Sequence, residues 1–182
     1  MPDFSNINIE TPLLLLKSIS IKQSNELFKI YSNKEVQKYT DNELIDNVTD
    51  TKKLIISLIK KSKNKSNIFL GIFLQNNNKL IGTIRIYHID FKHSFSSLGI
   101  LLDKQYWRKG IMQETLNYFL DYYFNKLNFN RIEAQSFVEN YPAIKLFEKL
   151  GFKNEGRLRK NFLIAGKFED SFLFSMLKNE FK

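Results

Sequence analysis

The stretch that decides the fold reads Leu98-Gly-Ile-Leu-Leu-Asp-Lys-Gln-Tyr-Trp-Arg-Lys-Gly-Ile-Met112. An apolar run typical of a strand changes here into a basic turn that contains Gly110 and opens a long amphipathic helix. Backbone N–H groups at a helix N-terminus are unpaired and lie at the positive end of the helix dipole, so such a turn binds anions. Arg108 and Lys109 add positive charge beside it. The stretch therefore predicts a site for a polyphosphate ligand.

Hydrophobic periodicity on both sides of this turn predicts alternating strands and helices. The strands are expected at residues 13–16, 68–75, 79–89, 95–102, 131–138, 152–164 and 168–177. The helices are expected at residues 24–32, from Thr49 or Asp50 through Ile59, at 111–127 and at 141–150. This order predicts an α/β (α+β) fold, with one mixed, mostly antiparallel sheet of about seven strands flanked by about four helices. Residues 1–182 are expected to form a single domain.

Composition excludes several kinds of site. The 182 residues contain no cysteine, which excludes disulfides, cysteine-ligated metal sites and thiol nucleophiles. His88 and His93 flank one loop without further ligands, so we expect no metal site. The absence of a secretory signal and of a membrane-length apolar run predicts a cytoplasmic protein with no membrane partner.

The formal net charge of +9 raises nucleic acid as a partner. The densest basic run, Lys60-Lys61-Ser62-Lys63-Asn64-Lys65, lies between a predicted helix and a predicted strand. Such runs at the ends of elements are usually solvated loops. We therefore favour solubility as the role of this charge, and we do not expect nucleic acid as a partner.

Five motifs in order carry a family resemblance that covers nearly the whole chain. They are Ile9-Glu10-Thr11-Pro12-Leu13-Leu14-Leu15, Tyr106-Trp107-Arg108-Lys109-Gly110-Ile111-Met112, Glu139-Asn140 followed by Lys149-Leu150-Gly151-Phe152, Glu155-Gly156-Arg157-Leu158-Arg159, and Gly166-Lys167-Phe168-Glu169-Asp170. With the predicted order of elements, they resemble the GNAT superfamily of acetyl-CoA-dependent N-acetyltransferases, and within it the RimJ/RimL-type branch. The fold implied is the GNAT fold over residues 1–182.

The resemblance implies acetyl-CoA as the cofactor and CoA as a product. Its pantetheine arm would pair with the edge of the predicted strand as another strand would, because it carries two amides. The cofactor-binding residues implied are Leu98, Gly99, Ile100, Leu101 and Leu102 on the strand, Trp107, Arg108, Lys109, Gly110, Ile111 and Met112 in the turn, and Asn140. Asn140 is equally a candidate N-cap for the helix that follows, and one residue can fill both roles.

Acetyl transfer to an amine requires removal of a proton, and Glu133 is the candidate general base. It lies on the predicted strand at residues 131–138, where Arg131 and Gln135 share its face. A surface glutamate paired with Arg131 is the competing interpretation.

Five residues depart from the family pattern. Arg108 stands where the branch usually has glycine, and it can supply its N–H if its φ is negative. Ser96 and Ser97 stand where the branch often has glutamate. Phe147 and Ala143 replace the tyrosine and serine that protonate the CoA thiolate in many relatives. Tyr106, Tyr141 or water are the remaining proton donors.

We therefore predict an N-acetyltransferase that acts by direct attack in a ternary complex. The acceptor is a primary amine, either a protein N-terminus, with a ribosomal protein as one such substrate, or a small-molecule amine. The alternatives are a non-catalytic acyl-CoA sensor, motivated by the missing proton donors, and a basic RNA- or ribosome-binding protein. The residues do not decide between a monomer and a homodimer.

Overall fold

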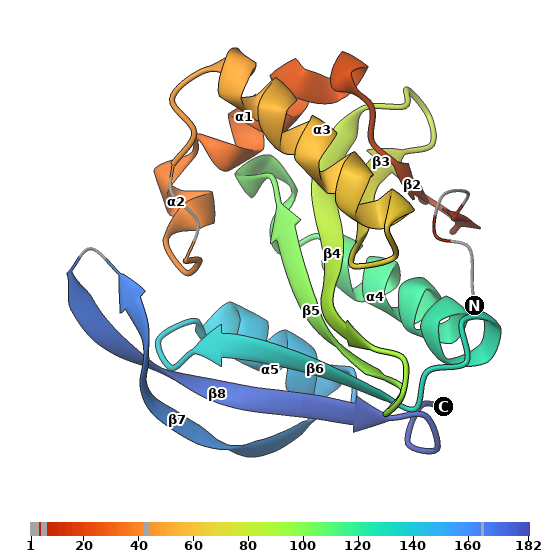
Figure 1. Cartoon of the computed structure of the whole chain (residues 1–182), viewed down its shortest axis with the longest axis vertical. Helices are drawn as coiled ribbons and strands as arrows, with labels where there is room; N and C mark the ends of the chain where they lie inside the picture. The colour runs from red at the N-terminus through yellow and green to blue at the C-terminus, as the bar shows by residue number, and fades with distance from the viewer. Residues whose placement is uncertain (1–3, 5–6, 42–43, 165) are drawn as a thin grey trace.

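One eight-stranded sheet organises the computed structural model, which describes residue 4 and residues 7–41, 44–164 and 166–182 (Figure 1). The order is β1-β2-β3-β4-β5-β6-β8-β7, and only β5 and β6 run parallel. The strands are β1 (Asn8–Glu10), β2 (Leu14–Ser18), β3 (Ile68–Leu74), β4 (Leu80–Asp90), β5 (Phe95–Leu102), β6 (Arg131–Phe137), β7 (Lys153–Ile164) and β8 (Lys167–Leu177). The predicted mixed, mostly antiparallel sheet is confirmed.

The described residues form five α-helices, two on one face of the sheet and three on the other (Figure 1). They are α1 (Ser24–Tyr31), α2 (Lys34–Gln37), α3 (Val48–Lys63), α4 (Ile111–Asp121) and α5 (Tyr141–Lys149). None of the helices within the described ranges is long and apolar enough to cross a membrane.

Two short elements exceed the predicted counts of strands and helices. β1 is separate because the chain turns at Pro12, where the Leu14 N–H donates to the Thr11 hydroxyl at 2.8 Å. α2 is a single turn whose N-terminus is capped by the Asn33 side chain. Both depend on local turn chemistry rather than on hydrophobic periodicity, so the periodicity did not predict them.

The helix predicted at residues 111–127 changes type before its end. α4 stops at Asp121, and Tyr122–Lys126 continue as one π-helical turn. The Leu127 N–H donates to the Tyr122 carbonyl at 3.0 Å, five residues back. The buried Tyr123 hydroxyl in this turn bonds Ser96 of β5 at 2.7 Å and donates to the Arg131 carbonyl of β6 at 2.8 Å. The turn thus ties together the start of both strands.

Two apolar clusters fix the helices on the sheet. Under α4, the side chains of Leu116, Phe119 and Leu120 are fully buried in the larger cluster. On the opposite face, α1 and α3 bury Leu27 and Ile55 in a second cluster. Burial of apolar surface stabilises both layers at about 25 cal/mol per Å². The sheet between them is therefore a rigid base for the site.

β5 and β6 separate after four residue pairs. Their ladder runs from Phe95↔Arg131 to Leu98↔Ala134. Beyond this ladder, β5 and β6 do not pair with each other, which leaves residues 99–102 of β5 and residues 135–137 of β6 apart. This leaves a wedge in the middle of the sheet, closed at the Tyr123 end and open toward the turn at residues 103–110.

Candidate active site

The open side of β5 is a strand edge inside the protein. Residues 99–102 still pair with β4, from Arg85↔Gly99 to Gly82↔Leu102. In such a ladder, alternate N–H and C=O groups point away from the partner strand. On this side they face the wedge, so an extended molecule that carries amides can pair with them.

The turn after β5 is fixed to the sheet by two hydrogen bonds. The Asp103 N–H donates to the Ile81 carbonyl at 2.8 Å, and the Trp107 indole N–H donates to the Leu102 carbonyl at 2.8 Å. Gly110 then begins α4 with φ at 75°. Arg108 also lies in the left-handed region, with φ at 60°. The condition set for Arg108, a negative φ, is not met, but its N–H still has no acceptor among the described residues.

Six successive backbone donors of this turn are left for a ligand. Among the residues that the structure describes, none of the N–H groups of residues 108–113 donates to a protein acceptor. The first N–H used within the helix is that of Glu114, which donates to the Gly110 carbonyl at 3.0 Å. With the cationic side chains of Arg108 and Lys109 beside them, these donors fit a pyrophosphate.

The left-handed arginine predicts a measurable strain. A non-glycine residue in the left-handed region costs about 1–2 kcal/mol. Replacement by glycine removes this cost, but part of the gain in stability is lost because glycine gives up more backbone entropy on folding. We expect Arg108→Gly to raise the Tm by about 2–4 °C, measured by thermal unfolding without ligand. Lys109→Gly is the control, because Lys109 has no positive φ; an equal rise in that variant would contradict strain at Arg108.

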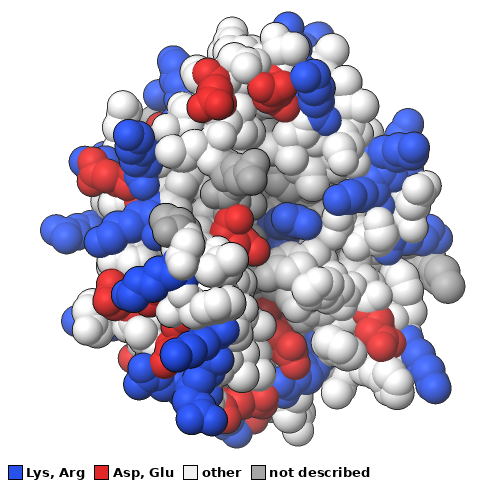
Figure 2. Space-filling view, turned by 60° about the vertical axis from the view of Figure 1, so that its left-hand side comes forward, with Lys and Arg blue, Asp and Glu red and all other residues white. Residues whose placement is uncertain are grey.

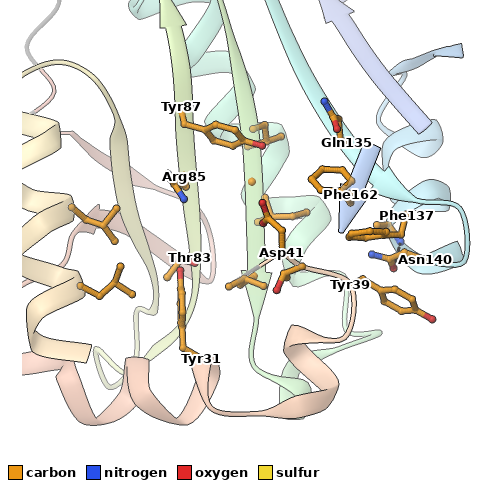
Figure 3. A pocket seen from close by; sticks show the side chains of 18 of the residues that line it. Tyr31, Tyr39, Asp41, Thr83, Arg85, Tyr87, Gln135, Phe137, Asn140 and Phe162 are labelled. Atoms are coloured by element: carbon orange, nitrogen blue, oxygen red, sulfur yellow. Dashed lines mark hydrogen bonds between the residues drawn. The ribbon is translucent and has the colours of Figure 1, made fainter. Parts of the chain in front are cut away.

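A cavity of about 600 Å³ lies on the α1 and α3 face of the wedge (Figure 3). Its walls come from α1, residues 39–41, α3, β4, β5, β6 and the start of α5. Apolar groups dominate part of the wall, including the rings of Phe137 and Phe162, whose centroids lie 5.0 Å apart. The polar lining side chains are mainly those of Tyr31, Asp41, Thr83, Arg85, Tyr87, Gln135 and Asn140.

Asn140 is positioned for both roles that the sequence left open, the N-cap of α5 and a contact to the cofactor. Its side-chain oxygen accepts the Ala143 N–H at 3.4 Å as the N-cap of α5. The same residue lines the cavity. No described group accepts a hydrogen bond from its amide N–H₂, so that amide can donate to a ligand in the wedge.

Glu133 is held away from the cavity by an ion pair. It pairs with Ser97 at the closed end of the wedge, and its carboxylate accepts the Arg131 Nε–H at 2.8 Å. Arg131 also binds Glu155 through two hydrogen bonds, of 2.8 and 2.6 Å. With a further bond from Ser175, Arg131 lowers the pKa of Glu155 to about 2. Glu133 is not among the residues that line the cavity.

The two positions at which relatives carry a proton donor, Phe147 and Ala143, have no hydroxyl group in this chain. Phe147 is 3% exposed and packs on Phe152 and Phe174, and both it and Ala143 line the cavity. The Tyr106 ring lies between the ammonium groups of Lys79 and Lys109, and Tyr141 is 66% exposed. Neither tyrosine lines the cavity.

Sequence reasoning missed the polar floor of the cavity. Thr83, Arg85 and Tyr87 alternate on β4 with Ile84 and Ile86, which are fully buried on the other face. In the sequence, this alternation places polar residues on one face of an otherwise apolar strand, and it could have indicated the polar floor. Burial raises the pKa of the Tyr87 phenol, with Asp41 adding to the effect, so its hydroxyl keeps its proton at neutral pH.

Comparison with known proteins identifies the same architecture. Residues 14–153 match the family model of the acetyltransferase (GNAT) domain. The chain is 32% identical over 172 residues to the uncharacterized N-acetyltransferase p20 of Bacillus licheniformis, covering 94% of this chain and 96% of that protein.

Two solved structures share the fold. RimJ of Mycobacterium smegmatis, in complex with CoA-disulfide, has a TM-score of 0.90 at 18% identity and covers 99% of this chain and 91% of its own. The ribosomal-protein-S5-alanine acetyltransferase of Vibrio fischeri has a TM-score of 0.81 at 23% identity, over 97% of this chain and 100% of its own.

Proposed function

Because this chain belongs to the GNAT family and is an acetyl-CoA-dependent N-acetyltransferase, we propose that it acetylates a primary amine by direct attack in a ternary complex. The acceptor is a protein N-terminus or a small-molecule amine. The observation that carries this proposal is the wedge between β5 and β6, which has free phosphate-binding donors at its open end and the cavity on one face. The single sheet from Asn8 to Leu177 supports one catalytic domain over residues 1–182, which we place in the cytoplasm.

The donor-binding residues follow from this arrangement. The edge formed by Leu98–Leu102 holds the pantetheine arm. The turn from Trp107 to Met112 surrounds the pyrophosphate through its free N–H groups, which begin at residue 108, with Arg108 and Lys109 neutralising its charge. Asn140 donates its amide from across the wedge. Acetyl-CoA supplies an activated acyl group as a thioester.

The reaction requires two proton movements. The amine nitrogen forms a bond to the acetyl carbon while the carbon–sulfur bond breaks, so the nitrogen loses a proton and the thiolate gains one. Glu133 takes the first proton through a water molecule that connects its carboxylate to the cavity. The thiolate takes its proton from water, because Phe147 and Ala143 offer none.

We expect Glu133→Gln to lower kcat by about 100-fold or more while the Kd of acetyl-CoA stays unchanged, because a general base contributes about 10²–10⁴ in rate. The readouts are release of free CoA across a panel of amines and isothermal titration. Glu155→Gln is the matched control, since it removes the other carboxylate on Arg131 and leaves Glu133 in place. Wild-type rates in Glu133→Gln would give Glu133 a purely structural role.

Phe147 and Ala143 favour a second function, a non-catalytic acyl-CoA sensor. Their side chains lack a proton to give, although they line the cavity. Tight acetyl-CoA binding with no CoA release on any amine would establish the sensor. Failure to bind acetyl-CoA would contradict both functions.

The RNA-binding alternative has less support on the surface. On the face drawn in Figure 2, lysines and arginines are interspersed with acidic side chains instead of forming one continuous basic surface. An RNA-binding role requires an affinity that falls steeply with salt. A shallow salt dependence would dismiss it.

A further inference from the structure

Arg85 is a cation in the cavity wall that lacks an anion. It lies on β4, and its Nε is buried without a hydrogen-bond acceptor. Within the described ranges, no carboxylate forms an ion pair with Arg85, and its Cζ lies 5.0 Å from the centroid of the Tyr87 ring. Burial of an unpaired guanidinium donor is costly, so a ligand that brings a hydrogen-bond acceptor to this donor is bound favourably.

Arg85 lies beside the part of the wedge in which we place the amine that is acetylated. Arg85 pairs across the ladder with Gly99, and Gly99 is the first residue of β5 beyond the last pair with β6. Cross-strand partners lie about 5 Å apart at Cα and project to the same face. Because Gly99 has no side chain, nothing on β5 separates Arg85 from the wedge at this level.

The rest of the cavity suits the remainder of a small zwitterion. Asp41 lines it and lies in Figure 3 between the β4 wall with Arg85 and the side that carries Phe137. Its carboxylate can receive an ammonium group. Phe137 and Phe162 provide an apolar wall for an organic side chain.

We propose that the acceptor is a small amine that also carries an anionic group, a free amino acid being the simplest such molecule, and that Arg85 binds the anion. The proposal rests on the proposed acetyl transfer. Arg85 holds the carboxylate and Asp41 attracts the ammonium group. The ammonium group first releases one proton to solvent, and the neutral amine is then acetylated with the proton balance given above. A polyamine would place a cation against Arg85, and a protein N-terminus has its carboxyl group in a peptide bond.

The test compares amine acceptors that carry an anionic group with acceptors that lack one. The kcat/KM of CoA release is measured with L-phenylalanine, L-phenylalaninamide, 2-phenylethylamine and an alanine-starting peptide, and with O-phosphoethanolamine as the phosphate-bearing amine. We expect phenylalanine to exceed its amide by about 10- to 100-fold. A higher rate with O-phosphoethanolamine would support Arg85 and identify phosphate as the anion.

Arg85→Gln should abolish this preference, so that the ratio of kcat/KM for phenylalanine to kcat/KM for its amide falls to near one. Arg85→Lys keeps the charge without the bidentate geometry and should retain part of the preference, which guards against a folding defect in the glutamine variant. Arg159→Gln, on the exposed β7 strand, is the surface control.

Two further outcomes separate this proposal from the one on which it depends. Acetylation of every amine at similar rates, insensitive to Arg85→Gln, would overturn the anion site and leave acetyl transfer standing. Binding of acetyl-CoA with no turnover of any amine would overturn the acetyl transfer itself, and the anion site with it.

Discussion

Replacing Gly110 by aspartate should abolish CoA binding and leave the fold intact. Gly110 begins α4 with φ at 75°, and a Cβ added there would meet nothing within 4 Å. Aspartate tolerates the left-handed region better than most residues. Its carboxylate would lie among the free N–H groups that bind the pyrophosphate, and juxtaposed like charges cost several kcal/mol. The affinity for CoA should therefore fall by more than about 100-fold.

Gly110→Asn separates charge from shape in this experiment. Asparagine has nearly the same size and the same tolerance of positive φ, but it carries no charge. Isothermal titration with CoA should show a modest loss for asparagine and no detectable binding for aspartate, with similar Tm values for both. Equal affinities for the two variants and the wild type would move the phosphate site away from this turn.

The phosphate-binding turn could be predicted from the sequence because its determinants are local. The change from an apolar run to a basic, glycine-containing turn before an amphipathic helix is set by neighbouring residues. The positive φ of Arg108 could not be predicted from the sequence, because arginine normally avoids the left-handed region. The turn that holds Arg108 is anchored on the sheet by the Trp107 indole, which bonds Leu102 of β5, and by the Asp103 N–H, which bonds Ile81 of β4.

The wedge and the cavity depend on long-range pairing that no local pattern shows. The alternation on β6 placed Glu133 and Gln135 on one face, and this holds in the structure. The ion pair of Arg131 with Glu155 depends on β7, which reaches this place only through its pairing with β8. Asp41 likewise lines the same cavity as Arg85, from a segment more than forty residues away.

The separation of β5 from β6 makes Gly99 the position where a side chain would intrude most directly on the reacting groups. Gly99 follows the last paired residue of β5, and its Cβ would point toward the same face as Arg85 and Tyr87. That Cβ would lie 3.5 Å from Tyr87 Cε1 and 3.9 Å from the Arg85 carbonyl oxygen, which are ordinary contacts. A Cβ therefore fits at this position, and the further atoms of a larger side chain would extend toward the cavity.

Gly99→Leu should lower the kcat/KM for the amine by about 100-fold or more, because displacement of an acceptor by about 1 Å can cost that much. The Kd of acetyl-CoA should change little, since the backbone edge that holds the pantetheine arm is kept. Gly99→Ala adds a single methyl group, so its kcat/KM should fall by less than about tenfold. The loss in kcat/KM should therefore increase with side-chain volume. Wild-type turnover in Gly99→Leu would show that the acceptor amine does not approach the thioester through the cavity beside Arg85, and that the wedge is entered from its other face.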